Sequence, residues 1–243
     1  MNDLMTKTVR EIALEWPGST RVFEEYKIDY CCGGRKPLEE ACTNAGADPA
    51  EVMKKIDSAL AGDGTASWSN ESSLSKLVDH IIDTHHAFTR KEIANLQPLM
   101  EKVAGVHGDH HPELLELKEE FEALAASVLP HMGKEEMMLF PYISEMERRA
   151  ANGWVPAMPP FGTVRHPVQV LSNDHDLDGD TLKRMRRLSK DYTPPADACP
   201  SYTGLYHRLA ELERDLHQHI HLENNILFPR AVELEENVVS AAA

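Results

Sequence analysis

Hydrophobic and polar positions follow a helical period along most of the chain from about residue 72 onward. Apolar side chains recur every three or four residues, the spacing at which residues share one face of an α-helix. Polar, glycine- or proline-containing breaks interrupt this pattern near residues 105–112, 152–161 and 193–200. The pattern predicts four long helices, roughly at 72–104, 113–148, 164–191 and 201–236. Four helices with connections of about ten residues are typical of an up-down-up-down bundle.

The N-terminal part predicts shorter helices. Asp48-Pro49-Ala50-Glu51 is a helix start signal, with an N-cap, a proline in the first helical position and a carboxylate in the first turn. The next stretch, residues 62–71, is mostly small and polar, as interdomain linkers are. We therefore expect a small helical domain at 1–61, a linker at 62–71 and a bundle at 72–243.

The amino-acid composition agrees with an all-α protein and limits the classes of partner that we expect it to bind. The 243 residues are 42% hydrophobic and rich in helix-forming Leu, Ala, Glu and Met. A formal charge of −15 repels phosphate backbones and anionic lipids, so we expect neither nucleic acid nor a membrane surface as partner. The chain has no apolar run long enough to span a bilayer, and its first residues do not resemble a secretory signal, so we expect a cytoplasmic location.

Two segments of the predicted long helices share one sequence pattern. Residues 131–141 and 219–229 both read H-x-x-x-E-x-x-x-L-F-P, which indicates duplicated helix pairs. A histidine and a glutamate four residues apart lie one above the other on a helix face. His131 with Glu135, and His219 with Glu223, can therefore each reach one ion.

Both pairs lie on the apolar stripe that we expect to face the bundle core. Burying an imidazole and a carboxylate without partners would cost several kcal/mol, so a bound metal ion explains them best. In the first long helix the same stripe selects His85 and turns His80 and His86 away; in the third it selects His175. The stripe of the first helix runs through Leu74, Leu77, Val78, Ile81, Ile82 and Phe88, and that of the second continues past Glu135 to Met138.

The stripes thus predict four histidines and two glutamates around one site. These residues are His85, His131, Glu135, His175, His219 and Glu223. Six ligands are too many for one tetrahedral zinc ion, but they suit two ions, each held by two histidines and bridged by both glutamates. Imidazole and carboxylate together favour iron or manganese, and the open coordination positions would admit O₂ or NO. The alternative is a core whose histidines are satisfied by ordinary hydrogen bonds.

These motifs resemble those of the haemerythrin-like fold, and the whole chain resembles the bacterial di-iron proteins that repair iron–sulfur centres, the RIC family. The bundle carries the family pattern His…H-x-x-x-E…His…H-x-x-x-E-N-N-x-L-F-P-R-A, which ends here at Ala231. Residues 29–34, Asp-Tyr-Cys-Cys-Gly-Gly, match the signature of the family's small cysteine-bearing domain. Oxygen-carrying haemerythrins usually have a further histidine in the third helix where this chain has Gly179, and that difference favours the repair family.

The resemblance implies a cofactor of two iron ions and a role in restoring iron–sulfur clusters damaged by nitrosative or oxidative stress. Damaged iron–sulfur proteins and the diatomic molecules NO and O₂ would then be its partners. Two other functions stay open: reduction or removal of NO, and sensing or carrying of O₂ or NO. A simple carrier has no need of a cysteine domain, whereas repair and NO reduction would use the same di-iron site. The sequence also leaves open whether the protein is a monomer or a homodimer.

Cys31 and Cys32 are candidates for a redox or iron-handling role. The alternative is that they are two ordinary small hydrophobic residues, because free cysteine is commonly buried. Backbone amides of the Gly33-Gly34 turn could lower a thiol pKa and make it reactive, which favours the functional interpretation. We expect Cys42 and Cys199 to be structural.

The other histidines show no comparable pattern. His107, His110 and His111 lie in an acidic corner that we expect to be a solvated loop, although the resembling family also has a histidine at the position of His107. Four more are expected at the surface: His166, His207, His217 and His221. Asp178 lies on the inward face of the third helix, where it could be a hydrogen-bond partner of a metal ligand.

Overall fold

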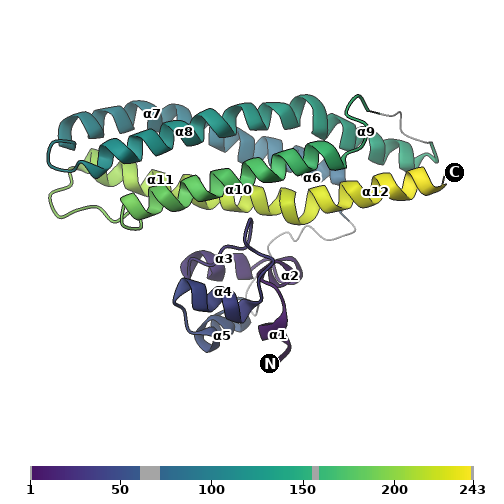
Figure 1. Cartoon of the computed structure of the whole chain (residues 1–243), viewed down its shortest axis with the longest axis horizontal. Helices are drawn as coiled ribbons and strands as arrows, with labels where there is room; N and C mark the ends of the chain where they lie inside the picture. The colour runs from purple at the N-terminus through teal and green to yellow at the C-terminus, as the bar shows by residue number, and fades with distance from the viewer. Residues whose placement is uncertain (1, 61–71, 155–158, 242–243) are drawn as a thin grey trace.

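The computed structural model describes residues 2–60, 72–154 and 159–241, and these residues form helices and connecting turns with no strand. Figure 1 shows a long helical bundle with a smaller group of short helices, α1–α5, beside it. The expected all-α class with a four-helix bundle is confirmed. The expected linker, residues 62–71, lies outside the described residues.

The N-terminal helices pack around their own apolar cluster. They are α1 (Asn2–Thr6), α2 (Val9–Glu15), α3 (Ser19–Glu25), α4 (Leu38–Ala45) and α5 (Pro49–Leu60). Ile12 and Phe23 are fully buried in this cluster. The predicted start of α5 is correct, since the Asp48 side chain accepts a hydrogen bond from the Ala50 amide at 2.9 Å.

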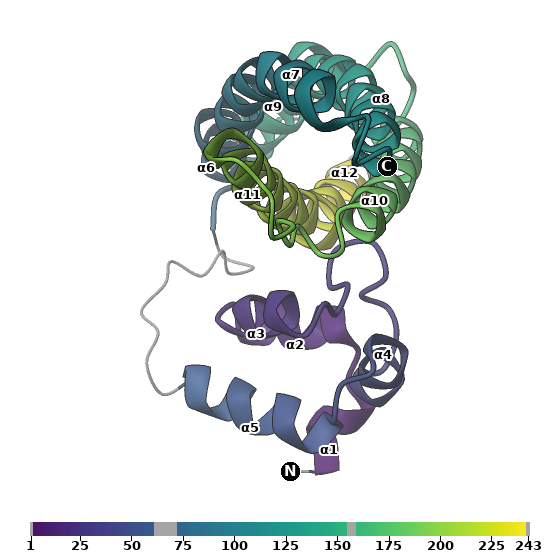
Figure 2. The same ribbon diagram turned by 90° about the vertical axis from the view of Figure 1, so that its left-hand side faces the viewer.

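The bundle consists of four helical columns that surround a common axis, as the end-on view in Figure 2 shows. The first comprises α6 (Leu74–His80), η1 (Ile81–His86) and α7 (Ala87–His107); the second, α8 (Glu113–Lys134), η2 (Glu135–Leu139) and α9 (Phe140–Ala151). The third is α10 (Arg165–Leu188), and the fourth comprises α11 (Pro200–Leu222), η3 (Glu223–Leu227) and α12 (Phe228–Ala241). The segments η1, η2 and η3 are single π-helical turns inside otherwise α-helical columns.

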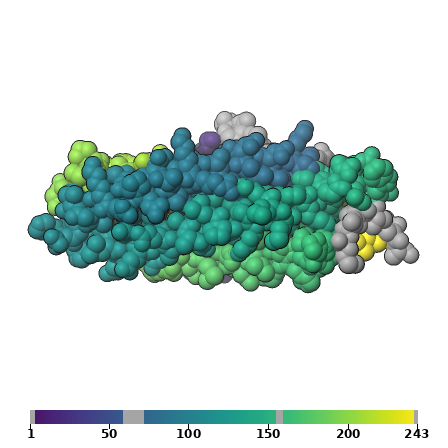
Figure 3. Space-filling model, turned by 90° about the horizontal axis from the view of Figure 1, so that it is seen from above, coloured from purple at the N-terminus to yellow at the C-terminus, as the bar shows by residue number. Residues whose placement is uncertain are grey.

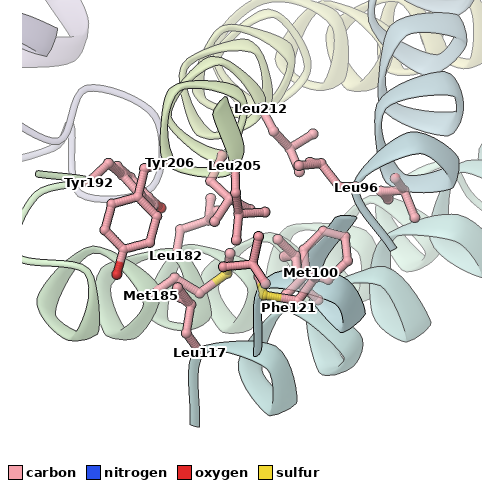
Figure 4. Packing of buried hydrophobic residues seen from close by; sticks show 14 of the residues in the cluster. Leu96, Met100, Leu117, Phe121, Leu182, Met185, Tyr192, Leu205, Tyr206 and Leu212 are labelled. Atoms are coloured by element: carbon pink, nitrogen blue, oxygen red, sulfur yellow. The ribbon is translucent and has the colours of Figure 1, made fainter. Parts of the chain in front are cut away.

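Apolar side chains fill the bundle in two separate clusters. One cluster occupies the end built by α7, α8, α10 and α11, where Phe121, Leu182 and Leu205 meet (Figure 4). The other occupies the opposite end and includes Leu77 and Phe228. In sequence, the histidines and glutamates of the repeat lie between the residues of these two clusters. The bundle therefore has a polar layer in its middle, closed by apolar packing at both ends.

The surface of the bundle away from α1–α5 is formed largely by α7 and α8, which lie side by side in the space-filling view of Figure 3. Along the part of the chain that the structure describes, no helix combines the length and the apolar character needed to cross a membrane.

Candidate metal centre

Six buried side chains from the four columns meet in the polar layer of the bundle. They make two overlapping groups: a first group of His86, Glu135, His219 and Glu223, and a second group of His131, Glu135, His175 and Glu223. Within each group the possible ligand atoms all lie within 4.8 Å of one another. Both groups contain the same two glutamates, and no member of either is more than 3% exposed. Each group can therefore surround one ion.

The two glutamates are oriented so that each presents one oxygen to each group. Glu135 Oε2 lies 3.5 Å from His86 Nε2 in the first group, and Glu135 Oε1 lies 3.3 Å from His131 Nε2 in the second. Glu223 Oε1 lies 2.9 Å from His219 Nε2, and its Oε2 lies 3.2 Å from His175 Nε2. This is the arrangement that bridging carboxylates have between two metal ions.

The site fits a cation because its own hydrogen bonds do not satisfy it. Both carboxylate oxygens of Glu135, Oε2 of Glu223 and Nδ1 of His219 are buried without a hydrogen-bond partner. Burying such groups costs several kcal/mol unless another charge or a metal compensates them. Imidazole nitrogens with carboxylate oxygens are a donor set that suits iron or manganese.

The electrostatics of the cluster show which charges a metal ion would replace. Burial alone would lower the pKa of His86, but the nearby carboxylates of Glu135 and Glu223 raise it to about 10. Burial likewise opposes protonation of His131, and Glu135 raises its pKa to about 9. Burial would raise the pKa of Glu223, yet the neighbouring histidines hold it well below its usual range. Protonated histidines are thus the counter-charges of the glutamates.

His85 lies outside both groups, and His86 occupies the place that we expected His85 to take. The His85 Nδ1 atom is 3.0 Å from Oδ1 of Asp215, and its ring stacks parallel to that of His219 with centroids 5.8 Å apart. His86 is fully buried, with its Nε2 atom 3.0 Å from Nε2 of His219. The prediction that the helical register turns His86 outward is therefore wrong.

The π-helical turn η1 is the physical reason for this exchange. A π turn contains one residue more than an α turn and shifts everything after it by one position. The buried stripe consequently steps by five residues, from Ile81 to His86, and continues through Thr89, Ile93, Leu96 and Met100. The apolar residues before η1 are in register with His85, whereas those after it are in register with His86. That second register was the signal in the sequence that pointed to His86.

The other two π turns begin at the shared glutamates. Segment η2 starts at Glu135 and η3 starts at Glu223, while α10 contains no π turn. In the second column the extra residue buries Leu139 and leaves Met138, which we expected to face inward, 50% exposed. Single π turns are rare in proteins and are frequent at functional sites.

Three of the four histidines have a polar partner on their outer ring nitrogen. Nδ1 of His86 lies 2.7 Å from Glu136, and Nδ1 of His175 lies 2.9 Å from the side-chain oxygen of Asn224. Nδ1 of His131 lies 3.3 Å from Asp174. Such partners fix the tautomer and the ring orientation of metal-binding histidines. Sequence reasoning did not find any of the three, although two directly follow a glutamate of the repeat.

Asp178, which we considered as a possible partner of a ligand, is buried on α10. Burial raises the pKa of this carboxyl group.

The N-terminal helices cover one side of the fourth column and bury a histidine that we expected at the surface. His221 is 3% exposed, because the Tyr30 ring packs 5.3 Å away and Asn225 bonds its Nδ1 atom. His217 is partly covered and lies 2.8 Å from Glu24. The predicted surface position is therefore wrong for His221, although its ring does point away from the two groups.

The remaining six histidines also lie away from both groups. His166 and His207 are exposed, as expected. His110 is also exposed, but His107 is the last residue of α7 rather than part of a loop, and its Nε2 atom lies 3.2 Å from Sγ of Cys199.

Cys32 lies against α10 directly beside one of the histidines. Its Sγ atom is 3.4 Å from the backbone oxygen of His175 and 3.7 Å from Sγ of Cys31, and all four cysteines of the chain are free thiols. A Cβ atom added at Gly179 would lie 3.3 Å from the same Cys32 sulfur. A side chain at position 179 would therefore press on the Cys32 thiol, which would have to shift to make room.

The glycine turn after the cysteines does not activate the thiols in the way we expected. The amides of Cys31, Cys32 and Gly33 all donate to one oxygen of Asp29, at 2.9 to 3.2 Å. They stabilise that carboxylate and not a thiolate. The hydrogen bond to Cys32, together with burial and the Asp29 charge, raises the pKa of Cys31 well above its usual value, so the expected lowering is wrong for Cys31.

Comparison with known proteins identifies similarity in both parts of the chain. A family model described as "Hemerythrin HHE cation binding domain" matches residues 77–231, and one described as "Domain of Unknown function (DUF542)" matches residues 5–60. The chain is 35% identical over 225 residues to a "Probable iron-sulfur cluster repair protein" of Haemophilus influenzae, covering 91% of this chain and 95% of the relative.

Two other relatives are similar over the same extent. Identity is 34% over 223 residues to the "Iron-sulfur cluster repair protein ScdA" of Staphylococcus haemolyticus, with 90% of this chain and 95% of that protein covered. It is 32% over 226 residues to the "Iron-sulfur cluster repair protein YtfE" of Dickeya chrysanthemi, with 93% and 96% covered. The similarity thus includes the N-terminal helices as well as the bundle.

Proposed function

The chain belongs to the family of iron–sulfur cluster repair proteins that carry a hemerythrin HHE cation binding domain, and we propose that it restores clusters damaged by nitrosative or oxidative stress. The observation that carries this proposal is the pair of overlapping ligand groups that share Glu135 and Glu223. We propose that they hold two iron ions. The ligands would be His86, His131, Glu135, His175, His219 and Glu223.

The bound iron would supply exchangeable ferrous ions and open coordination positions for small ligands such as NO or O₂. The protein side chains do the rest. The histidines offer neutral Nε2 atoms once their protons have left, and the two glutamates compensate the positive charge. The apolar clusters at both ends of the layer keep bulk water from the ligands.

We further propose that residues 1–61 act as a cysteine-bearing domain that handles iron or electrons for the bundle. Cys32 touches the backbone of His175, which places a soft ligand, its thiol, beside the helix that carries this histidine. A thiol in this position could accept a ferrous ion that leaves the bundle. The pair would then act as deprotonated ligands during transfer, because thiolates bind metal and thiols do not.

Anaerobic reactivation of a damaged enzyme would test the repair function. An NO-treated [4Fe–4S] dehydratase is mixed with iron-loaded protein, and recovery of its activity is followed together with its iron content. We expect recovery that exceeds the recovery with an equal amount of free ferrous iron. No recovery, combined with rapid catalytic consumption of NO by the reduced protein, would instead identify an NO-reducing enzyme.

A further inference from the structure

The two ligand groups differ in the hydrogen-bond partners of their histidines, on the ring nitrogen (Nδ1) that faces away from the group. The residue that follows each shared glutamate contacts a histidine of a different column: Glu136 holds His86 in the first group, and Asn224 holds His175 in the second. These positions are equivalent in the sequence repeat. One of them is a carboxylate and the other a neutral amide.

A second pair of equivalent positions differs even more. The residue before His175 is Asp174, which reaches Nδ1 of His131 at 3.3 Å. The residue before His86 is His85, which stacks on the ring of His219 and uses its own Nδ1 on Asp215. Nδ1 of His219 is buried without a partner. In the second group both histidines are therefore held, whereas in the first group only His86 is.

Glu136 is well placed to hold His86. Its Oε1 atom accepts from His86 Nδ1 at 2.7 Å and from a guanidinium nitrogen of Arg90 at 2.8 Å. The Glu136 side chain is 27% exposed and that of His86 is fully buried, so the contact lies at the edge of the core. A charged acceptor at this distance makes a strong hydrogen bond and leaves Nε2 as the lone-pair atom that faces the group.

We propose that Glu136 is a positioning residue for the ion of the first group, and that this ion is the more readily released because His219 lacks such a partner. The inference rests on the proposed function, in that two iron ions are bound. It identifies the ion that a client would receive. The carboxylate of Glu136 is then the contact that sets how fast the ion leaves.

Release kinetics from the full-length protein would test this. Protein loaded anaerobically with two ferrous ions is mixed with a ferrous chelator, and the coloured complex is followed in time. Two phases would appear whichever of the two ions left first. The variants are therefore needed to assign each phase to a ligand group. We expect Glu136→Ala to accelerate the first phase about 10–100-fold, the usual effect of losing an outer partner of a metal ligand, and to leave the second phase unchanged.

Two matched variants separate positioning from general loosening. Glu136→Gln keeps an acceptor oxygen and should restore much of the retention. Asn224→Ala removes the equivalent partner of His175 and should accelerate the second phase instead. If Glu136→Ala does not fold, Asn224→Asp tests the same idea in reverse, since a carboxylate behind His175 should slow the second phase.

The outcomes distinguish the inference from the proposed function. Equal acceleration of both phases by Glu136→Ala would overturn the inference, as would an Asn224→Asp variant with an unchanged second phase. Either result leaves the repair function standing, provided that the metal analysis still finds two irons. A wild-type protein that never binds a second ion would overturn both. Thermal unfolding followed by circular dichroism verifies that each variant is folded.

Discussion

His86 and His131 must lose their protons before they can bind a metal ion, and this gives the centre a defined pH dependence. Their pKa values are raised to about 10 and about 9, so at neutral pH both are protonated in the metal-free protein. The pKa of His175 is raised as well. We expect loading at pH 7 to release at least two protons per centre, and the apparent metal affinity to rise with pH until it levels off above those pKa values. Calorimetry in buffers of different ionisation enthalpy measures the proton release.

The same measurement at pH 8 tests whether the pKa values of these histidines are raised. Ligands with an ordinary histidine pKa of about 6.5 would be mostly neutral already at pH 8, and loading would then release almost no protons. Proton release that persists at pH 8 therefore supports the raised values. An affinity that falls as pH rises from 6 to 8 would contradict them.

Adjacent histidines in η1 give a sharp test at the scale of single residues. His86→Ala should reduce the bound iron from two ions to about one. The first group loses a ligand, whereas the second group keeps all four of its ligands, the two shared glutamates included. His85→Ala is the matched control and should retain both ions, since His85 bonds Asp215 and lies in neither group. Iron analysis of the purified variants measures both. If His85→Ala lost an ion and His86→Ala kept both, His85 would be the ligand, as the apolar stripe in the sequence predicts.

Five residues of the candidate site could be predicted from the sequence, since His131, Glu135, His219 and Glu223 stand in a repeat and His175 lies on an unbroken apolar stripe of α10. The sixth could not be assigned from the stripe before it, because a π turn intervenes. Helical propensity does not encode such a turn, which forms where burial of ligands and core residues outweighs the regular hydrogen-bond ladder. The outer partners likewise depend on contacts between columns and not on spacing within one.

At the scale of elements, the ends of the columns near the C-terminus are joined by carboxylate caps. Glu147 on α9 accepts from the Leu74 and Ser75 amides and from the hydroxyls of Ser73 and Ser75, at 2.6 to 2.9 Å. Glu235 on α12 likewise accepts from the amide of Val164 at the start of α10. Each carboxylate satisfies donors at a helix N-terminus that have no partner within their own helix.

Removing one of these caps should loosen the start of a column. Glu147→Ala leaves several donors of α6 without their acceptor, and we expect it to lower the free energy of unfolding by about 1–3 kcal/mol. Glu145→Ala is the matched control in the same helix, because its contacts with Arg148 and Arg149 are surface ion pairs worth about 0–1 kcal/mol. Chemical denaturation of the metal-free variants measures the difference. Equal losses in both would contradict a capping role.

At the scale of the whole molecule, all six candidate ligands belong to the bundle and none to the N-terminal helices. A chain that begins at Ser72 should therefore fold and bind two irons. It would lose the cover over His221 and the contact of Cys32 with His175, so we expect faster exchange of iron with solvent chelators. Iron analysis and chelator kinetics measure both properties. Failure of this shortened chain to bind iron would show that α1–α5 are part of the metal-binding fold.

The two cysteines are where the small N-terminal helices can affect the chemistry of the bundle. A variant with both Cys31→Ser and Cys32→Ser should retain two irons, because neither thiol belongs to a ligand group, but should lose most of its ability to reactivate a damaged cluster. Cys199→Ser is the control, since this thiol contacts His107 at the far end of the bundle and should not affect repair. Loss of iron in the double variant would make the thiols structural or ligating. Undiminished reactivation would show that Cys32 lies beside His175 without taking part in repair.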